Sequence, residues 1–139
     1  APRLGGDAAE REHDIRPGEV ITAIEIPGSA AARRSTYLKV RDRQSYEFAA
    51  ASAAIGLELE GDGRTIRDIR VALGGVATKP WRARAVENEL KGKTLTEATV
   101  RKASELAMEG AVDHGANHYK IELAPRVVAR AILNLGETA

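Results

Sequence analysis

The sequence has 139 residues, of which 43% are hydrophobic and 29% charged, the balance of a single globular domain. Its 21 Lys and Arg residues nearly match its 20 Asp and Glu residues, so the net charge of +1 lacks the basic excess of proteins that track nucleic acid phosphates. No apolar run approaches the roughly 20 residues of a membrane span. The absence of cysteine excludes disulfides, thiolate nucleophiles and cysteine-held clusters, so any redox chemistry requires a borrowed cofactor.

Residues 1–18 are predicted to be a linker or the tail of a preceding domain. They are rich in Gly, Ala, Pro and charge, and Pro17-Gly18 is a turn signal. The chain begins at Ala1 and has no secretory pattern, so we expect it to be a fragment that is not active by itself.

Two strands are predicted at 19–26 and 35–41, where residues alternate with the period of two that strands require. In the first, Val20, Thr22, Ile24 and Ile26 share one face, and Ile21, Ala23 and Glu25 share the other. In the second, Leu38 and Val40 share one face, and Tyr37, Lys39 and Arg41 share the other. We expect these strands to be neighbours in one sheet.

Two further strands are predicted at 47–60 and 65–73. Alternating apolar residues point inward from both, and Gly61-Asp62-Gly63 between them is a hairpin signal. The two strands should therefore pair antiparallel.

Three helices are predicted at 80–91, 96–113 and 122–135. Thr78 and Pro80 precede the first as a capping hydroxyl and an early proline, and Thr94 or Thr96 can cap the second. About four strands followed by three helices indicate an α+β fold, in which the helices pack on one face of an antiparallel sheet.

The histidine pair His114 and His118 is the one candidate for metal binding. The spacing of four beside Asp113 would present two imidazoles to a metal on a helix. Gly115 and Asn117 disfavour a helix here, so we predict a polar loop and assign no metal ligand. The sequence also lacks phosphate-binding glycine motifs and a nucleophile elbow.

Ile21 and Lys39 are the two residues that break the expected surface pattern. A large apolar side chain and a cation point outward on the same side of two strands that we expect to be adjacent. One interpretation is an isolated surface residue and a solvated charge. The other is a wall against a planar, anionic ligand.

Four stretches resemble the C-terminal domain of the flavin-binding, or medium, subunit of the molybdenum hydroxylases. These enzymes include xanthine dehydrogenase, aldehyde oxidoreductase and aerobic carbon monoxide dehydrogenase. The stretches are 17–27 (PGEVITAIEIP), 37–49 (YLKVRDRQSYEFA), 72–77 (ALGGVA) and 117–132. The resemblance implies a fold like that of the carbon monoxide dehydrogenase flavoprotein C-terminal domain over 19–139, and a preceding FAD-binding domain to which 1–18 belong.

By this resemblance, FAD is bound mostly by the preceding domain, while partner subunits hold the molybdenum cofactor and 2Fe-2S clusters. Ile21 is then expected to pack near the flavin and Lys39 to approach it. An ammonium there favours the negative charge that develops on flavin reduction. Electrons would pass from the iron–sulfur clusters through FAD to an external acceptor.

The loop at 40–47 would lie beside the flavin edge, where the final acceptor docks. Xanthine dehydrogenase-like members carry paired acidic residues where this chain has Tyr46-Glu47. The resemblance therefore does not imply a nicotinamide acceptor for this chain. The sequence Tyr46-Glu47-Phe48-Ala49 resembles that of bacterial aldehyde oxidoreductase medium subunits instead.

One alternative stays open: the domain could dock the other subunits without touching the flavin. Nucleic-acid binding through Arg33, Arg34, Lys39, Arg41 and Arg43 is disfavoured, because Tyr37 is the only aromatic residue among them and the remaining charges cancel, so no nucleic acid partner is expected. We expect a cytoplasmic location, with the periplasm as the alternative for an exported complex.

Overall fold

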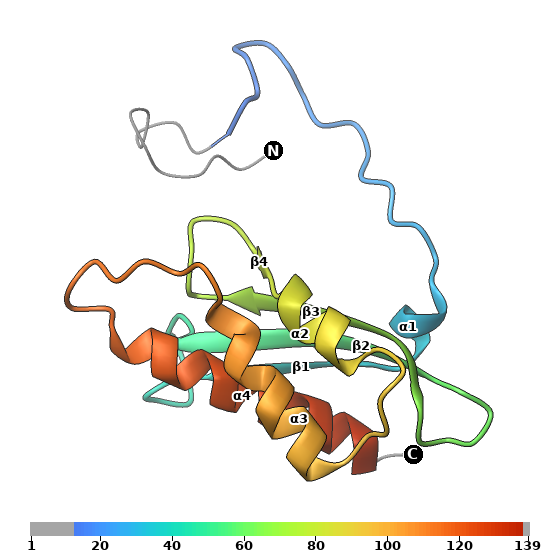
Figure 1. The fold of residues 1–139 in the computed structure, drawn as a ribbon. Coiled ribbons are helices and arrows are strands. Elements are labelled where there is room, and N and C mark those ends of the chain that lie inside the picture. Colours follow the sequence, from blue (N-terminus) through green and yellow to red (C-terminus); the bar gives the residue numbers. More distant parts are fainter. Residues whose placement is uncertain (1–12, 138–139) are drawn as a thin grey trace.

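The computed structural model describes residues 13–137 as a four-stranded antiparallel sheet with its longer helices on one face (Figure 1). The strands lie in the order β1-β2-β3-β4 and span Ser35–Val40, Ala51–Leu59, Ile66–Gly74 and Trp81–Arg82. The helices are α1 (Ala30–Arg33), α2 (Arg84–Leu90), α3 (Glu97–Ser104), the 3-10 helix η1 (Glu105–Met108) and α4 (Tyr119–Glu137). The predicted α+β class is confirmed. None of the helices in 13–137 combines the length and the apolar character that crossing a bilayer requires.

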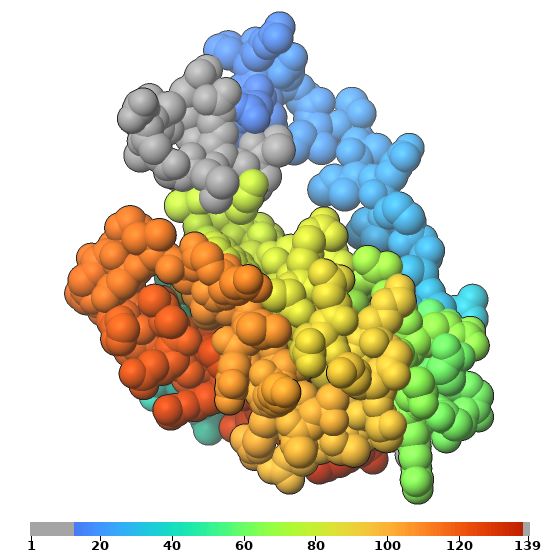
Figure 2. All heavy atoms as spheres, in the orientation of Figure 1, coloured from blue at the N-terminus to red at the C-terminus, as the bar shows by residue number. Residues whose placement is uncertain are grey.

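The two central strands build the core because alternate residues of each are apolar and point toward the helices. The buried hydrophobic residues of these strands are Ala51, Ala53, Ile55, Leu57, Ile66, Ile69, Val71 and Leu73. α4 packs on β1 and β2, α2 packs on β3, and α3 contacts both helices. In Figure 2 the helical segments cover most of the face turned to the viewer. The predicted hairpin of 47–60 and 65–73 is confirmed as β2 and β3, and 35–41 as β1.

Residues 19–26 do not form the predicted strand. The segment has no regular secondary structure, and Val20, Ile24 and Ile26 are 81%, 79% and 86% exposed. Its alternation is that of a strand, but a strand needs a hydrogen-bonding partner, and none of β1–β4 pairs with it. The expected contact between this segment and β1 is therefore wrong, since β1 is the edge of the sheet with β2 as its neighbour.

The fourth strand lies where the sequence predicted the start of a helix. Trp81 and Arg82 pair with Leu73 and Ala72 of β3, and α2 begins only at Arg84. A proline at 80 lacks a backbone N–H, so it suits the residue before an edge strand as well as the first turn of a helix. The local signal could not separate the two.

The remaining helices differ from prediction mainly at their ends. Thr96 caps α3 as expected, with its hydroxyl accepting the N–H of Thr99 at 3.2 Å. The helical segment predicted to reach 113 stops at Met108, ahead of Gly110, which has a φ of +80° that favours glycine. The helix predicted at 122–135 is confirmed as α4.

Glu87, on α2, continues the hydrogen-bond ladder that the short β4 leaves incomplete. Its Oε1 accepts the backbone N–H of Val71 at 2.7 Å, and the residue is only 8% exposed. The same carboxylate is paired with the guanidinium of Arg82 through both oxygens. A buried carboxylate is costly unless it is paired and hydrogen-bonded, and here it is both. Glu87 therefore fixes α2 to the outer edge of β3.

Glu87→Ala is expected to lower the free energy of unfolding by about 1–3 kcal/mol, because the buried N–H of Val71 loses its acceptor. Urea denaturation measures this. Glu89→Ala is the matched control: it lies on the same helix and removes only a partly exposed contact with Lys93 at 3.8 Å. That control should cost less than about 0.5 kcal/mol, and equal losses in the two variants would contradict the role of Glu87.

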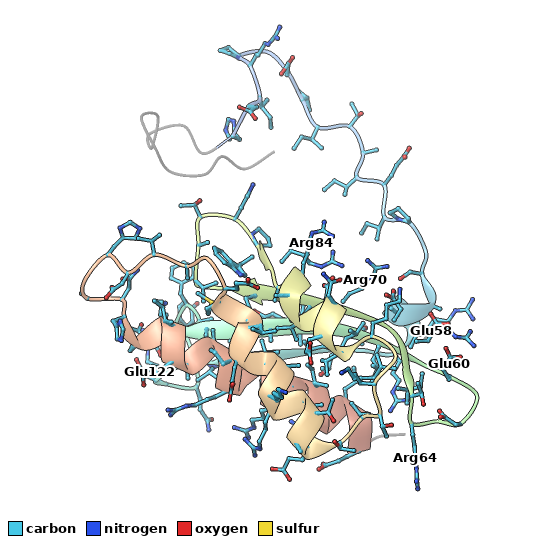
Figure 3. The ribbon with its side chains drawn as sticks, in the orientation of Figure 1. Glu58, Glu60, Arg64, Arg70, Arg84 and Glu122 are labelled. Carbon is cyan, nitrogen blue, oxygen red and sulfur yellow. The ribbon has the colours of Figure 1, made fainter. Side chains whose placement is uncertain are left out.

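Asp62 organises the turn between β2 and β3. Its Oδ1 accepts the backbone N–H groups of Arg64 and Thr65, each at 2.8 Å, and Oδ2 accepts the hydroxyl of Thr65. These hydrogen bonds favour the charged form and lower the pKa of Asp62 from 3.8 to about 2, with the Thr65 hydroxyl contributing most. Close to this turn, Arg67 bonds both Glu58 and Glu60, whose positions Figure 3 labels.

Because the pKa of Asp62 is lowered, the contribution of this turn to the stability of the fold depends on pH in the acidic range. The stabilisation from ionised Asp62 is present above pH 3.8 and is lost as the pH falls toward about 2. Asp62→Asn is therefore expected to lower the urea midpoint by a constant amount near neutral pH, and this difference from wild type should shrink as the pH falls from 3.8. Urea titrations at several pH values test this, and a difference that does not change with pH would rule it out.

Candidate functional site

The sheet face turned away from α2, α3 and α4, here called the open face, carries the predicted site residue Lys39. Along β1, Tyr37 and Lys39 are exposed, while Thr36, Leu38 and Val40 are half-buried on the helix side. The predicted division of this strand into two faces is confirmed. Lys39 therefore points away from the core.

Small residues form the floor of the open face. The cross-strand register aligns Lys39 with Ser52 and Gly74, and Tyr37 with Ala54 and Ala72. Residues directly opposite in antiparallel strands project to the same side of the sheet. Because the central strands bear only small side chains here, they leave a shallow groove of about 500 Å³. Its lining includes Tyr37, Ala54, Gly56, Arg70, Ala72 and Arg82.

The cations of the open face differ in their partners: Arg70 and Arg82 line the groove, and Lys39 lies outside it. Arg70 Nε donates to Asp68 at 2.8 Å, and Arg82 is paired with Glu87. Figure 3 labels Arg70. Lys39 Nζ instead donates to the neutral backbone carbonyl of Glu47 at 2.6 Å, and no carboxylate in 13–137 forms an ion pair with it. Lys39 thus keeps a positive charge available to an anionic group.

The chain enters the domain on the open-face side. The first helix, α1, is capped by Ser29, whose hydroxyl accepts the N–H of Ala32 at 3.2 Å. Ala31 is buried against the central strand: a Cβ added to Gly56 would lie 2.8 Å from the Ala31 carbonyl oxygen. Gly56 is on the open face because Ile55 and Leu57 on either side of it face the core. The segment before α1 extends away from the sheet in Figure 1.

Ile21 lies in this incoming segment and is 64% exposed. It is not on a strand beside β1, so the expected arrangement, with Ile21 and Lys39 on adjoining strands, is wrong. The structure does not bring the two residues together. The expected flavin contact of each residue stays a prediction.

The loop at 41–50 folds back toward Lys39. Glu47 Oε2 accepts the backbone N–H of Arg43 at 2.7 Å, and the guanidinium of Arg43 donates to the carbonyl of Tyr46 at 2.6 Å. Tyr46 has a φ of +49°, uncommon outside glycine, and it is 98% exposed, as Phe48 is at 96%. Phe48 lies ahead of β2, although the predicted strand at 47–60 includes it, and the alternation there gives no sign of this exposed aromatic pair.

His114 and His118 lie in the polar loop that the sequence predicted, between η1 and α4. His118 Nδ1 is 3.0 Å from Asp113 Oδ2, and Asp113 Oδ1 accepts the N–H of Gly115 at 2.7 Å. These contacts organise an exposed loop. In the described residues, 13–137, no three His, Cys, Asp or Glu side chains gather as a metal site would require.

A larger hollow of about 680 Å³ lies between the turn after β3 and the loop before α4. Trp81, Met108, Val112 and Lys120 are among its lining residues. Trp81 Nε1 donates to the carbonyl of Ala107 at 3.1 Å, which joins β4 to η1. None of the residues predicted to form the site lies here.

The sequence profile described as "CO dehydrogenase flavoprotein C-terminal domain" matches residues 36–135. The chain belongs to this family of flavoprotein domains. The matched region contains the sheet apart from Ser35, and the helices α2 to α4 apart from the last two residues of α4. The resemblance noted in the sequence is thereby confirmed.

Relatives of this flavoprotein domain include the aldehyde oxidoreductase FAD-binding subunit PaoB of Escherichia coli (strain K12). It is 35% identical over 128 residues, which cover 91% of this chain and 36% of that protein. The solved structure of quinoline 2-oxidoreductase from Pseudomonas putida 86 matches with a TM-score of 0.66 and 31% identity, over 76% of this chain and 38% of that one. The solved structure of carbon monoxide dehydrogenase from Hydrogenophaga pseudoflava matches with a TM-score of 0.62 and 34% identity, over 75% of this chain and 36% of that one. The chain thus spans about a third of the length of these relatives.

Proposed function

We propose that this domain closes one side of the flavin site in the FAD subunit of a molybdenum hydroxylase-type oxidoreductase. In that role FAD, held mostly by a preceding domain of the same polypeptide, accepts electrons from iron–sulfur clusters and delivers them to an external acceptor. The partners are that preceding domain, a molybdenum-containing large subunit and an iron–sulfur small subunit. The observation that carries the proposal is the ammonium of Lys39 on the open face, which forms no ion pair with a carboxylate in 13–137.

The direction of the incoming chain supports this placement. α1 packs on the open face at Gly56, so the polypeptide before α1 approaches the domain from the side on which Lys39 lies. A preceding domain attached there meets the open face rather than the helices. The small-residue floor between Tyr37 and Arg82 allows a flat partner to approach the backbone closely.

Lys39 has the chemistry that a reduced flavin needs nearby. Reduction places negative charge on the ring, and an ammonium favours that charge, most strongly where water is excluded. Arg70 and Arg82 are less suited because carboxylates already compensate their charges. Lys39 is therefore the proposed flavin-facing cation.

Ile21 is proposed to contribute an aliphatic wall that excludes water from the ring. Its segment, 19–26, has the alternation of a strand but no strand partner in the described residues, and four of its large apolar residues are exposed. We propose that the preceding domain, to which 1–18 also belong, supplies that partner. Ile21 and Lys39 would then reach the flavin from two separate parts of the chain.

Lys39→Ala in the full-length subunit, within its complex, is expected to weaken FAD retention and slow flavin reoxidation. A hydrogen bond to a charged group contributes about 1.5–3 kcal/mol, so FAD affinity should fall by roughly 10-fold to 100-fold. FAD release during gel filtration and stopped-flow absorbance measure the two effects. Lys102→Ala, on the outer surface of α3, is the control. Wild-type values of both quantities in Lys39→Ala would remove Lys39 from the site.

A second candidate function is subunit docking without flavin contact. The exposed Tyr46 and Phe48 favour it, because exposed aromatic residues are enriched where proteins associate. If docking is the role of this loop, the double variant Tyr46→Ser, Phe48→Ser should fail to co-purify with the partner subunits while its FAD content stays at wild-type level. Loss of FAD with intact assembly would favour the flavin role instead.

A further inference from the structure

Lys120, the second residue of α4, joins three segments that are distant in sequence. Its Nζ donates to the carbonyl of Ala50 at 2.8 Å and to the carbonyl of Gly75 at 2.7 Å. Ala50 ends the loop that follows β1, and Gly75 follows directly after β3. One ammonium group therefore holds the start of a helix, the end of a loop and the end of a strand.

The position of Lys120 in the helix is unfavourable apart from these contacts. A cation in the first turn of a helix faces the positive end of the helix dipole, where acidic residues are favoured. No carboxylate in 13–137 forms an ion pair with Lys120, so its charge is met by two neutral carbonyls and by the ring of Tyr119, whose centroid is 5.4 Å from Nζ. These carbonyls, rather than the helix, explain a cation at this place.

The backbone around the two carbonyls leaves little freedom. Gly75 has a φ of +73°, and a Cβ at this position would lie 2.7 Å from the carbonyl oxygen of Ala49. Only glycine allows this approach of two backbone segments. The backbone N–H of Ala50 donates to the carbonyl of Val40 at 2.9 Å, and this hydrogen bond joins the two ends of the loop at 41–50. Lys120 thus completes a fixed base for the loop at 41–50.

The same loop supplies the acceptor for the proposed flavin-facing cation. The carbonyl of Glu47, three residues before Ala50, accepts the ammonium of Lys39 at 2.6 Å. A loop anchored at its base holds that carbonyl in place, and the carbonyl in turn fixes the long, otherwise mobile side chain of Lys39. The contacts run from Lys120 through the loop to Lys39.

We infer that Lys120 is a positioning residue: by binding the carbonyls of Ala50 and Gly75 it holds the loop at 41–50 and sets the Lys39 ammonium toward the flavin. The inference rests on the proposed function for its last step. It assigns Lys120 no contact with the flavin.

The first experiment tests the anchor without reference to flavin chemistry. In the full-length subunit within its complex, Lys120→Met removes the ammonium but keeps most of the side chain volume. Hydrogen exchange of the backbone amides of Arg43 and Ala50, which donate to Glu47 and to the carbonyl of Val40, should accelerate by roughly tenfold or more, because two charge-assisted hydrogen bonds are lost. Lys120→Arg, which keeps several donors, should restore slow exchange. Lys102→Met on α3 is the control and should not change it.

The second experiment tests the step from the loop to Lys39. Lys120→Met should shift the flavin midpoint potential to more negative values, in the same direction as Lys39→Ala and by less. The double variant should match Lys39→Ala alone, because a residue that acts through Lys39 has nothing left to position. Lys120→Arg should return the potential toward wild type. Additive shifts in the double variant would overturn the inference.

The outcomes separate this inference from the proposed function. Unchanged loop exchange in Lys120→Met, together with a shifted potential in Lys39→Ala, overturns the positioning role alone. A wild-type potential in Lys39→Ala contradicts the proposed function, and accelerated exchange would then leave Lys120 as a structural contact only. If Lys120→Met fails to fold, Lys120→Gln replaces it, since its shorter amide cannot span both carbonyls, and the same outcomes apply.

Discussion

The pairing of β2 with β3 is the constraint on which the rest of the domain depends. One face of this pair carries the large aliphatic residues that α2 and α4 cover, and the other carries small residues at one end and the charged residues Glu58, Asp68 and Arg70 toward the other. Burial of the first face fixes the register, because a slip of one residue would turn every apolar side chain outward. The same register creates the flat open face, so the packing of the core also determines which side chains a partner can meet.

Period-two alternation in the sequence was sufficient to predict these central strands and the exposed side of Lys39. Alternation reports which residues share a face but carries no information on the neighbouring strand. For that reason the segment at 19–26 was assigned to this sheet, although no described strand pairs with it. A strand of two residues, as in β4, has no period to detect, and the residues around Pro80 fit either element. The hairpin turn was predictable because its signal is local, in Gly61-Asp62-Gly63.

The contacts that organise the candidate site could not be predicted, because they join residues far apart in sequence. Glu87 completes the ladder of β3 from a helix, and Lys120 reaches Ala50 across 70 positions. Each looks like an ordinary charged helix residue in the sequence. What distinguishes them is a backbone acceptor or donor brought near by the tertiary fold. The family resemblance indicated Lys39 but none of the contacts that hold it in place. A sequence motif identifies its own residues and does not identify the distant residues that position them.

The position of β1 at the sheet edge gives its charges another consequence. An edge strand presents hydrogen-bonding groups that can recruit a strand from another molecule, and lysine is a common natural safeguard against such association. Lys39 lies near the end of β1, and Arg41 and Arg43 follow it directly. Two copies that met edge to edge in parallel and in register would bring these cations together. Mutual repulsion would then disfavour amyloid-like stacking of this domain.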